Sequence, residues 1–69
     1  MELRLQTFED VQKDTPLLQL PVVFTGTRRE ECERYAADQG YTFKSSPKML
    51  FGGYFYKNTG SATFALLPT

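Results

Sequence analysis

The chain has 69 residues, with eight basic and eight acidic side chains, one cysteine and no histidine. The single cysteine excludes an internal disulfide, and the lack of histidine argues against a His/Cys zinc site or a Cys–His nucleophile. A chain of this length builds one domain whose small core supplies only about 3–5 kcal/mol of stability.

Signals for membrane insertion and secretion are missing from the sequence. No apolar run approaches the length of a membrane span. The N-terminal residues alternate charged and apolar side chains and lack the continuous apolar segment of a signal peptide. The unpaired Cys32 fits a reducing compartment better than secretion. We therefore expect a cytoplasmic protein without a membrane partner.

The first predicted elements are a strand and a helical turn. Residues 2–6 alternate polar and apolar side chains, which is typical of a half-buried strand. Thr7 can cap a short helical turn over residues 8–13. The spacing of Phe8 and Val11 in this turn predicts that both side chains face the core.

The middle of the chain predicts a second strand and then a helix. The strand covers residues 22–25, because the proline before it cannot donate a hydrogen bond within a sheet. The helix covers residues 28–39, from a capping box of Thr27 and Glu30 to a left-handed stop at Gly40. Its narrow apolar stripe consists of Cys32, Tyr35 and Ala36. This stripe should pack on a sheet, so the thiol is interpreted as a buried hydrophobe rather than a nucleophile.

The C-terminal part predicts three strands. A short strand over residues 41–44 leads through a turn at 45–48 into a hairpin. The hairpin strands are residues 49–57 and 61–67. The three-residue loop 58–60 joins them, with its glycine at positive φ.

The register of this hairpin determines which side chains share a face. Pairing Lys57 with Ser61 gives two faces by alternation. The first, larger and expected to receive the helix, carries Leu50, Tyr54, Tyr56, Ala62, Phe64 and Leu66. The second carries Phe51, Phe55, Lys57, Thr63, Ala65 and Leu67.

Gly52-Gly53, in the first strand of this hairpin, is either a bulge or a flat spot on which a partner lies. The second face is too apolar to meet only water, so we expect a partner there, with a second copy in a homodimer as one such cover.

Two arginines at the start of the predicted helix form another candidate site. Arg28 and Arg29 lie where positive charge opposes the helix dipole. Two interpretations remain open: either Arg29 pairs with Glu33 while Arg28 faces solvent, or both arginines hold a carboxylate or phosphate of a partner. The glycine spacing of a nucleotide-binding loop is missing, so a nucleotide is not expected.

Aromatic and basic residues are concentrated in the C-terminal half. Residues 39–69 contain three lysines, no acidic residue and most of the aromatic side chains. This composition is typical of a sheet that binds nucleic acid, so nucleic-acid binding is the alternative function. The residues that would serve it are Phe43, Lys44, Lys48, Tyr54 and Tyr56. We rank nucleic acid below a protein partner, because the net charge is zero.

The stretch VVFTGTRREECERY, from Val22 to Tyr35, resembles short proteins of phage or prophage type. The resemblance carries no catalytic residues. It implies a protein that binds and blocks host machinery, including defence nucleases, and that acts in the host cytoplasm.

The sequence as a whole predicts one α+β domain over residues 1–69. One helix packs on an antiparallel sheet of four to five strands, in the order β-β-α-β-β-β along the chain. The predicted function is stoichiometric protein binding, as an inhibitor or accessory subunit, without catalysis, cofactor or metal. A self-associating structural protein is a further alternative. The predicted partner-binding residues are Arg28, Arg29, Phe51, Phe55, Lys57 and Leu67.

Overall fold

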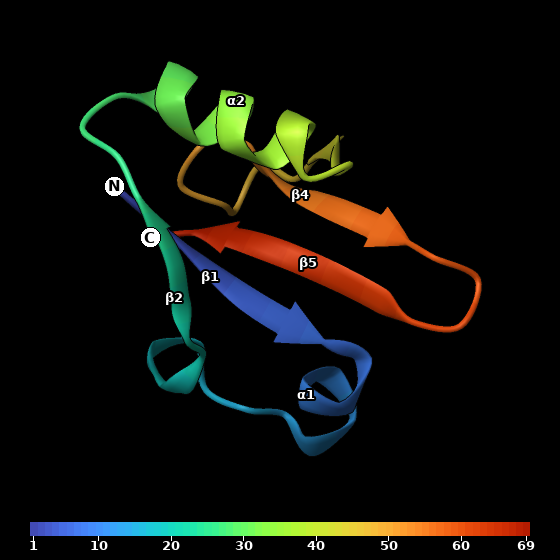
Figure 1. The fold of residues 1–69 in the computed structure, drawn as a ribbon. Coiled ribbons are helices and arrows are strands. Elements are labelled where there is room, and N and C mark those ends of the chain that lie inside the picture. Colours follow the sequence, from blue (N-terminus) through green and yellow to red (C-terminus); the bar gives the residue numbers. More distant parts are fainter.

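The structure is a computed structural model that describes residues 1–69. Its elements are β1 (Glu2–Thr7), α1 (Phe8–Lys13), a 3₁₀ turn (Leu17–Gln19), β2 (Val22–Thr25), α2 (Arg29–Asp38), β3 (Thr42–Ser45), β4 (Gly53–Asn58) and β5 (Thr63–Pro68). The five strands form one antiparallel sheet in the order β2-β1-β5-β4-β3 (Figure 1). The predicted α+β class and the predicted order of the main elements are confirmed. No helix is both long enough and apolar enough to cross a membrane.

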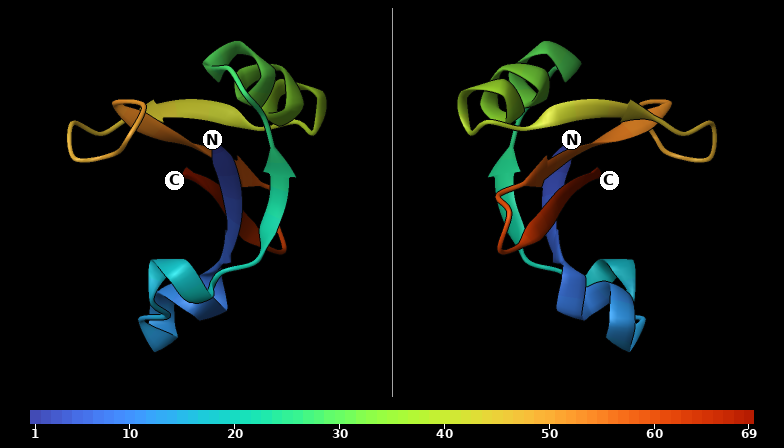
Figure 2. Two further views of the ribbon diagram at one scale, coloured as in Figure 1. Left: turned by 90° about the vertical axis from the view of Figure 1, so that its left-hand side faces the viewer. Right: turned by 90° about the vertical axis from the view of Figure 1, so that its right-hand side faces the viewer.

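The helix α2 joins the two outer strands of the sheet, because β2 precedes it and β3 follows it. It therefore runs from one edge of the sheet to the other and covers one face. Figure 2 shows the sheet strongly twisted, with α2 at one end of the molecule and α1 and the 3₁₀ turn at the other. In the centre, β1 pairs with β5, and Glu2 and Thr69 exchange backbone hydrogen bonds of 2.9 and 2.8 Å.

The start of α2 is fixed by one carboxylate. Glu31 Oε1 accepts hydrogen bonds from the backbone N–H of Thr27 and of Arg28, each 2.9 Å, and from the Thr27 hydroxyl at 2.7 Å. The predicted capping box used Glu30, which was wrong by one position. The reason is that the helix begins at Arg29, so Glu31 is the residue that reaches back over the first turn.

The end of α2 follows the predicted pattern. Gly40 takes a positive φ of 85°, which favours glycine because it has no Cβ. Its N–H donates to the carbonyl of Ala37, and the N–H of Tyr41 donates to the carbonyl of Ala36. These two bonds form a Schellman motif, which turns the chain sharply into β3.

The short helix α1 is also capped as expected, but its orientation differs from the prediction. Thr7 Oγ1 accepts from the N–H of Asp10, whose carboxylate accepts from the Thr7 N–H in return. Phe8 and Val11 were expected in the core, and this was wrong: they are 59% and 56% exposed. A helix of six residues cannot bury its apolar side chains where no second layer covers it.

The core lies between α2 and the sheet. Its buried members are Leu3, Cys32, Ala36, Phe51, Phe55 and Leu66. The predicted helix stripe is thus correct, and Tyr35 packs against this cluster. Phe24 of β2 stacks on Tyr35 with ring centroids 4.5 Å apart, which fixes the helix to the outer strand.

The hairpin of β4 and β5 has a different register from the predicted one. Phe55 lies opposite Leu66 and Asn58 lies opposite Thr63, so four residues, 59–62, separate the paired strands. Gly60 has the expected positive φ, 87°. Relative to the predicted pairing of Lys57 with Ser61, the partner of each β4 residue moves by three positions. An odd shift exchanges the faces of one strand relative to the other.

This register corrects the assignment of β4. Phe51 and Phe55 were expected on an exposed face, and this was wrong: they are 6% and 4% exposed and belong to the core. Tyr54 and Tyr56 were expected in the core and instead lie on the opposite side of the sheet. The assignment of β5 was right for Leu66, which is 1% exposed.

The glycine pair before β4 has two separate roles. Gly52 has φ 74°, so it is the residue that turns the chain after the 46–51 segment. A Cβ on Gly53 would collide with the carbonyl oxygen of Lys44 and with the ring of Phe43. Gly53 therefore allows β3 to lie close to β4, which is one of the reasons that strand glycines are used.

Replacing Phe55 with alanine should abolish cooperative unfolding. Loss of a buried phenylalanine costs about 3–5 kcal/mol, and the core of so small a domain supplies about the same amount. Tyr56→Ala, one residue along the same strand but on the opposite face, should cost about 1 kcal/mol or less. Urea denaturation followed by circular dichroism measures both variants. A larger loss for Tyr56→Ala than for Phe55→Ala would show that the two faces are reversed.

Candidate functional site

The face of the sheet opposite α2 has no second layer, and we call it the open face. Residues opposite each other on neighbouring strands share a face, so the pairings Lys44–Tyr54, Tyr56–Ala65 and Gln6–Ala65 define it. Its side chains include Arg4, Gln6, Thr42, Lys44, Tyr54, Tyr56, Asn58, Thr63, Ala65 and Leu67. The open face is therefore built by β1, β3, β4 and β5 together.

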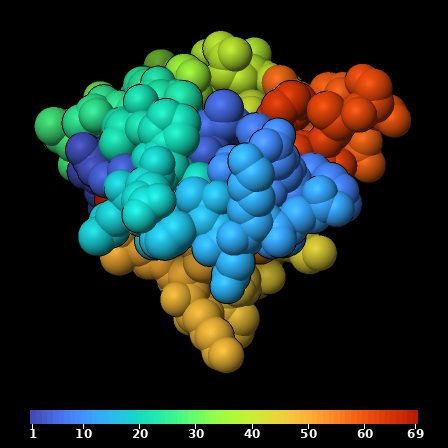
Figure 3. Space-filling view, turned by 90° about the horizontal axis from the view of Figure 1, so that it is seen from below, coloured from blue at the N-terminus to red at the C-terminus, as the bar shows by residue number.

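A groove of about 530 Å³ runs over this face, and eight of its eleven lining residues are hydrophobic. Phe8 and Val11 from α1 line it, and so does Met49 from the segment between β3 and β4. Figure 3 shows that segment, in gold, projecting from the surface beyond the blue α1 region. The groove thus lies between two projections, with Tyr54, Tyr56 and their neighbours as its floor.

Few charged side chains lie at the groove. Lys44 is the one charged residue among those that line it. Arg4, on the same face, is only 16% exposed at its side chain and donates to the carbonyls of Leu18 (3.2 Å) and Leu20 (2.7 Å). Because this guanidinium holds the 3₁₀ turn, Lys44 is the cation that remains available to a ligand in the groove.

The residues proposed for nucleic acid are partly brought together. Lys44, Tyr54 and Tyr56 line the groove. Phe43 lies on the opposite side of β3, where its ring makes an edge contact with Phe55 at 5.5 Å. Lys48 is exposed in the segment between β3 and β4. Three of the five residues therefore share one surface.

The residues proposed for a protein partner are dispersed. Phe51 and Phe55 are buried, as described above. Lys57 donates to the carbonyl of Gln39 at 2.9 Å and lies 4.6 Å from the ring centre of Tyr41. It therefore binds the C-terminal end of α2, where a positive charge is favourable. Of the four hairpin residues predicted to bind a partner, Leu67 alone lies on the open face and lines the groove.

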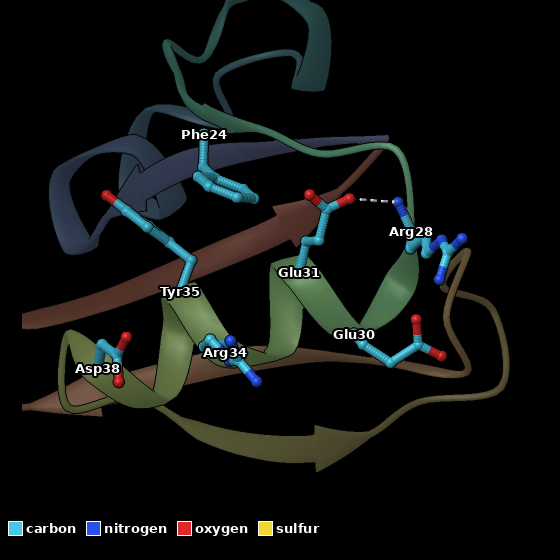
Figure 4. A pocket seen from close by; sticks show the side chains of 7 residues that line it. All are labelled: Phe24, Arg28, Glu30, Glu31, Arg34, Tyr35 and Asp38. Atoms are coloured by element: carbon cyan, nitrogen blue, oxygen red, sulfur yellow. Dashed lines mark hydrogen bonds between the residues drawn. The ribbon is translucent and has the colours of Figure 1, made fainter.

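The arginines at the start of α2 differ from each other. Arg29 Nε lies 3.5 Å from Glu33, and its guanidinium lies 5.3 Å from the ring centre of Phe51. Arg29 therefore stabilises the helix and covers the core, as the first of the two interpretations expected. Arg28 is exposed and extends away from the helix in Figure 4.

Two backbone amide groups at this helix end, those of Thr27 and Arg28, are already occupied. Glu31 binds them, and its hydrogen bonds, first that from the Thr27 hydroxyl, lower the pKa of the Glu31 carboxyl. An external anion would have to displace this internal carboxylate. The helix N-terminus therefore does not favour the interpretation in which Arg28 and Arg29 hold a partner's phosphate or carboxylate.

A second groove, of about 630 Å³, lies beside α2 and is shown in Figure 4. The stacked rings of Phe24 and Tyr35 form its apolar part. The remaining lining residues are Arg28, Glu30, Glu31, Arg34 and Asp38. Acidic side chains outnumber basic ones here, and both signs alternate along the helix. Such a surface suits solvent better than an anionic ligand.

Chemically reactive groups are few. Cys32 is buried, and desolvation raises the pKa of its thiol, so it stays protonated at neutral pH. No group of three or more His, Cys, Asp or Glu side chains lies close enough together to hold a metal ion.

Sequence reasoning missed several residues of the groove. The spacing of Phe8 and Val11 predicted that both lie in the core. No feature of the sequence around Met49 predicted that it lies at a surface groove. Gln6 was interpreted only as part of an alternating strand. Their common location depends on how α1 and the 46–52 segment fold over the sheet.

No protein-family model, curated protein or solved structure with which the chain was compared matches it. The function is therefore inferred from the surface of the protein.

Replacing Arg29 with alanine should lower the free energy of unfolding by about 0.5–1 kcal/mol, because the guanidinium loses its contact with Phe51. Arg28→Ala should change it by less than about 0.5 kcal/mol. Parallel urea titrations of the two variants measure the difference. Equal losses, or a larger loss for Arg28→Ala, would contradict the distinct roles of the two arginines.

Proposed function

We propose that this chain is a stoichiometric protein-binding protein that docks a partner on its open face, as an inhibitor or accessory subunit. One observation carries the proposal: the sheet has α2 on one face and an uncovered, mostly hydrophobic groove on the other. Protein interfaces are built around such apolar centres with aromatic anchors.

The exposure of the groove residues supports this function. Phe8 is 59% exposed, Val11 56% and Tyr56 39%. These side chains come from two elements and converge on one groove, unlike isolated surface hydrophobes, which need no explanation. Burying them against a partner would remove apolar area from water, which is the main driving force of association.

The single cation in the groove favours a protein over a nucleic acid. Nucleic-acid surfaces gain most of their affinity from several phosphate contacts, whereas Lys44 alone lines this groove. The net charge of zero adds no long-range attraction to a polyanion. The inhibitory role and the host cytoplasm as its location rest on the resemblance of residues 22–35 to phage-type proteins.

Polar replacement of the groove wall should abolish partner capture. The double variant Phe8→Ser/Val11→Ser changes exposed side chains, so the fold should be retained. The matched control is Leu18→Ser, which removes a 76% exposed leucine outside the groove. Tagged wild type and control should capture the same protein in equimolar amount from nuclease-treated lysate of the source cells, and the double variant should not.

Capture that survives in the double variant would contradict docking on the open face. Light scattering at high micromolar concentration tests whether a second copy of the chain binds the open face. A dimer mass that the double variant converts to a monomer mass would assign the open face to a homodimer, and would contradict a different protein as partner.

Single-stranded nucleic acid is the second candidate, because Tyr54 and Tyr56 lie two residues apart on the open face beside Lys44. Aromatic side chains on an open sheet can stack on bases. With one lysine in the groove, we expect binding no tighter than tens of micromolar, about the strength of non-specific binding at physiological salt.

Fluorescence anisotropy with a labelled oligonucleotide measures this affinity. Submicromolar binding that weakens steeply with salt and is lost in Tyr56→Ala would place nucleic acid above protein as the partner.

A further inference from the structure

We infer that the free edge of β3 pairs with an extended segment of the protein partner, and that this segment carries an acidic side chain beside Lys44. The partner strand would extend the sheet at the margin of the groove. This inference rests on the proposed protein-binding function and specifies the form in which the partner binds.

The hydrogen-bond register leaves backbone groups of β3 free. Ser46 N–H donates to the Gly52 carbonyl at 2.8 Å, which fixes the bonding phase of the β3–β4 ladder. Because bonded and non-bonded pairs alternate, Thr42 and Lys44 bond to β4. The N–H and C=O groups of Phe43 and Ser45 then point away from the sheet, in the arrangement that accepts a further strand.

The outer edge at β2 is interrupted by a bulge, whereas the outer edge at β3 is regular. Leu3 lies opposite Phe24 and Arg4 lies opposite Val22, so Val23 is an extra residue that forms a bulge in β2. Bulges are among the devices that block strand addition at sheet edges. β3 has a regular register with β4 and contains no proline.

The surroundings of β3 suit an extended peptide. All four of its residues are exposed, so neither a helix nor a loop covers the edge. Side chains of an added strand would alternate between the two faces. One set would lie beside Phe43, which is 41% exposed, and the other beside Thr42 and Lys44 on the open face, where Lys44 lines the groove.

Charge determines which peptide fits. Lys44 and Lys48 form no ion pair within the chain, and residues 39–69 contain no acidic side chain. A lysine on an edge strand repels a basic side chain of an added strand but attracts a carboxylate placed opposite or diagonal to it. The preferred segment therefore has an acidic residue on the Lys44 side and an apolar residue on the Phe43 side.

The decisive variant is Ser45→Pro. Proline removes the outward N–H of Ser45 and leaves every hydrogen bond within the sheet in place. Proline is tolerated on an edge strand where its nitrogen faces solvent. Ser45→Ala is the matched control, since it removes the hydroxyl and keeps the N–H. Circular dichroism and urea denaturation confirm that both variants fold. Lys44→Glu tests the charge, with Lys48→Glu as its control.

The probe is a display library of random short linear peptides, selected against the full wild-type chain. We expect the selected peptides to be enriched in acidic residues alternating with apolar ones. They should bind Ser45→Ala and Lys48→Glu like wild type, and Ser45→Pro and Lys44→Glu about tenfold more weakly or worse. Amide exchange should be fast at Phe43 and Ser45 in the free protein and slowed by the bound peptide.

Selected peptides that bind Ser45→Pro as well as wild type would overturn strand addition. If those peptides also fail to bind Phe8→Ser/Val11→Ser, the open face remains the binding site and only the β3 inference fails. Peptides insensitive to both changes would contradict the proposed function as well. Protection of Phe43 and Ser45 in the free protein that increases with concentration would assign the edge to a second copy and contradict a partner strand.

Discussion

The pairing of β4 with β5 is the constraint on which the rest of the structure depends. With Phe55 opposite Leu66, both side chains meet the buried stripe of α2 and complete the core. Because side chains alternate along a strand, the same pairing sends Tyr54 and Tyr56 to the other face. A slip by one residue would expose an aromatic core residue to water, so burial and register enforce each other.

The route of α2 follows from the same arrangement and limits where a partner can bind. The helix joins the two outer strands and packs on one face of the sheet. The open face and two strand edges of the sheet remain accessible, and the bulge interrupts the edge at β2. The groove and the β3 edge adjoin each other at Lys44, so one partner segment can contact both.

Local signals in the sequence predicted local structure well, and long-range arrangement poorly. Thr7 and Gly40 mark helix ends because the backbone geometry there depends on nearby residues. The face of β4 could not be predicted in this way, since Phe55 and Tyr56 are both large and apolar enough to be buried. The choice depends on the loop before β5, where one glycine fits loops of several lengths. The groove was missed for the same reason, because α1 and Met49 reach it only through the tertiary fold.

The α-proton contacts between β4 and β5 test this account most directly. Thr59 N–H donates to the Ala62 carbonyl, so the pairs Asn58–Thr63 and Tyr56–Ala65 are non-hydrogen-bonded, with Cα atoms about 4.5 Å apart. Nuclear Overhauser spectroscopy should therefore show a strong α-proton contact between Tyr56 and Ala65. A contact between Tyr56 and Ala62 in its place would show that the strands pair as the three-residue loop predicts. It would place the tyrosines in the core and remove the open face on which the proposed function rests.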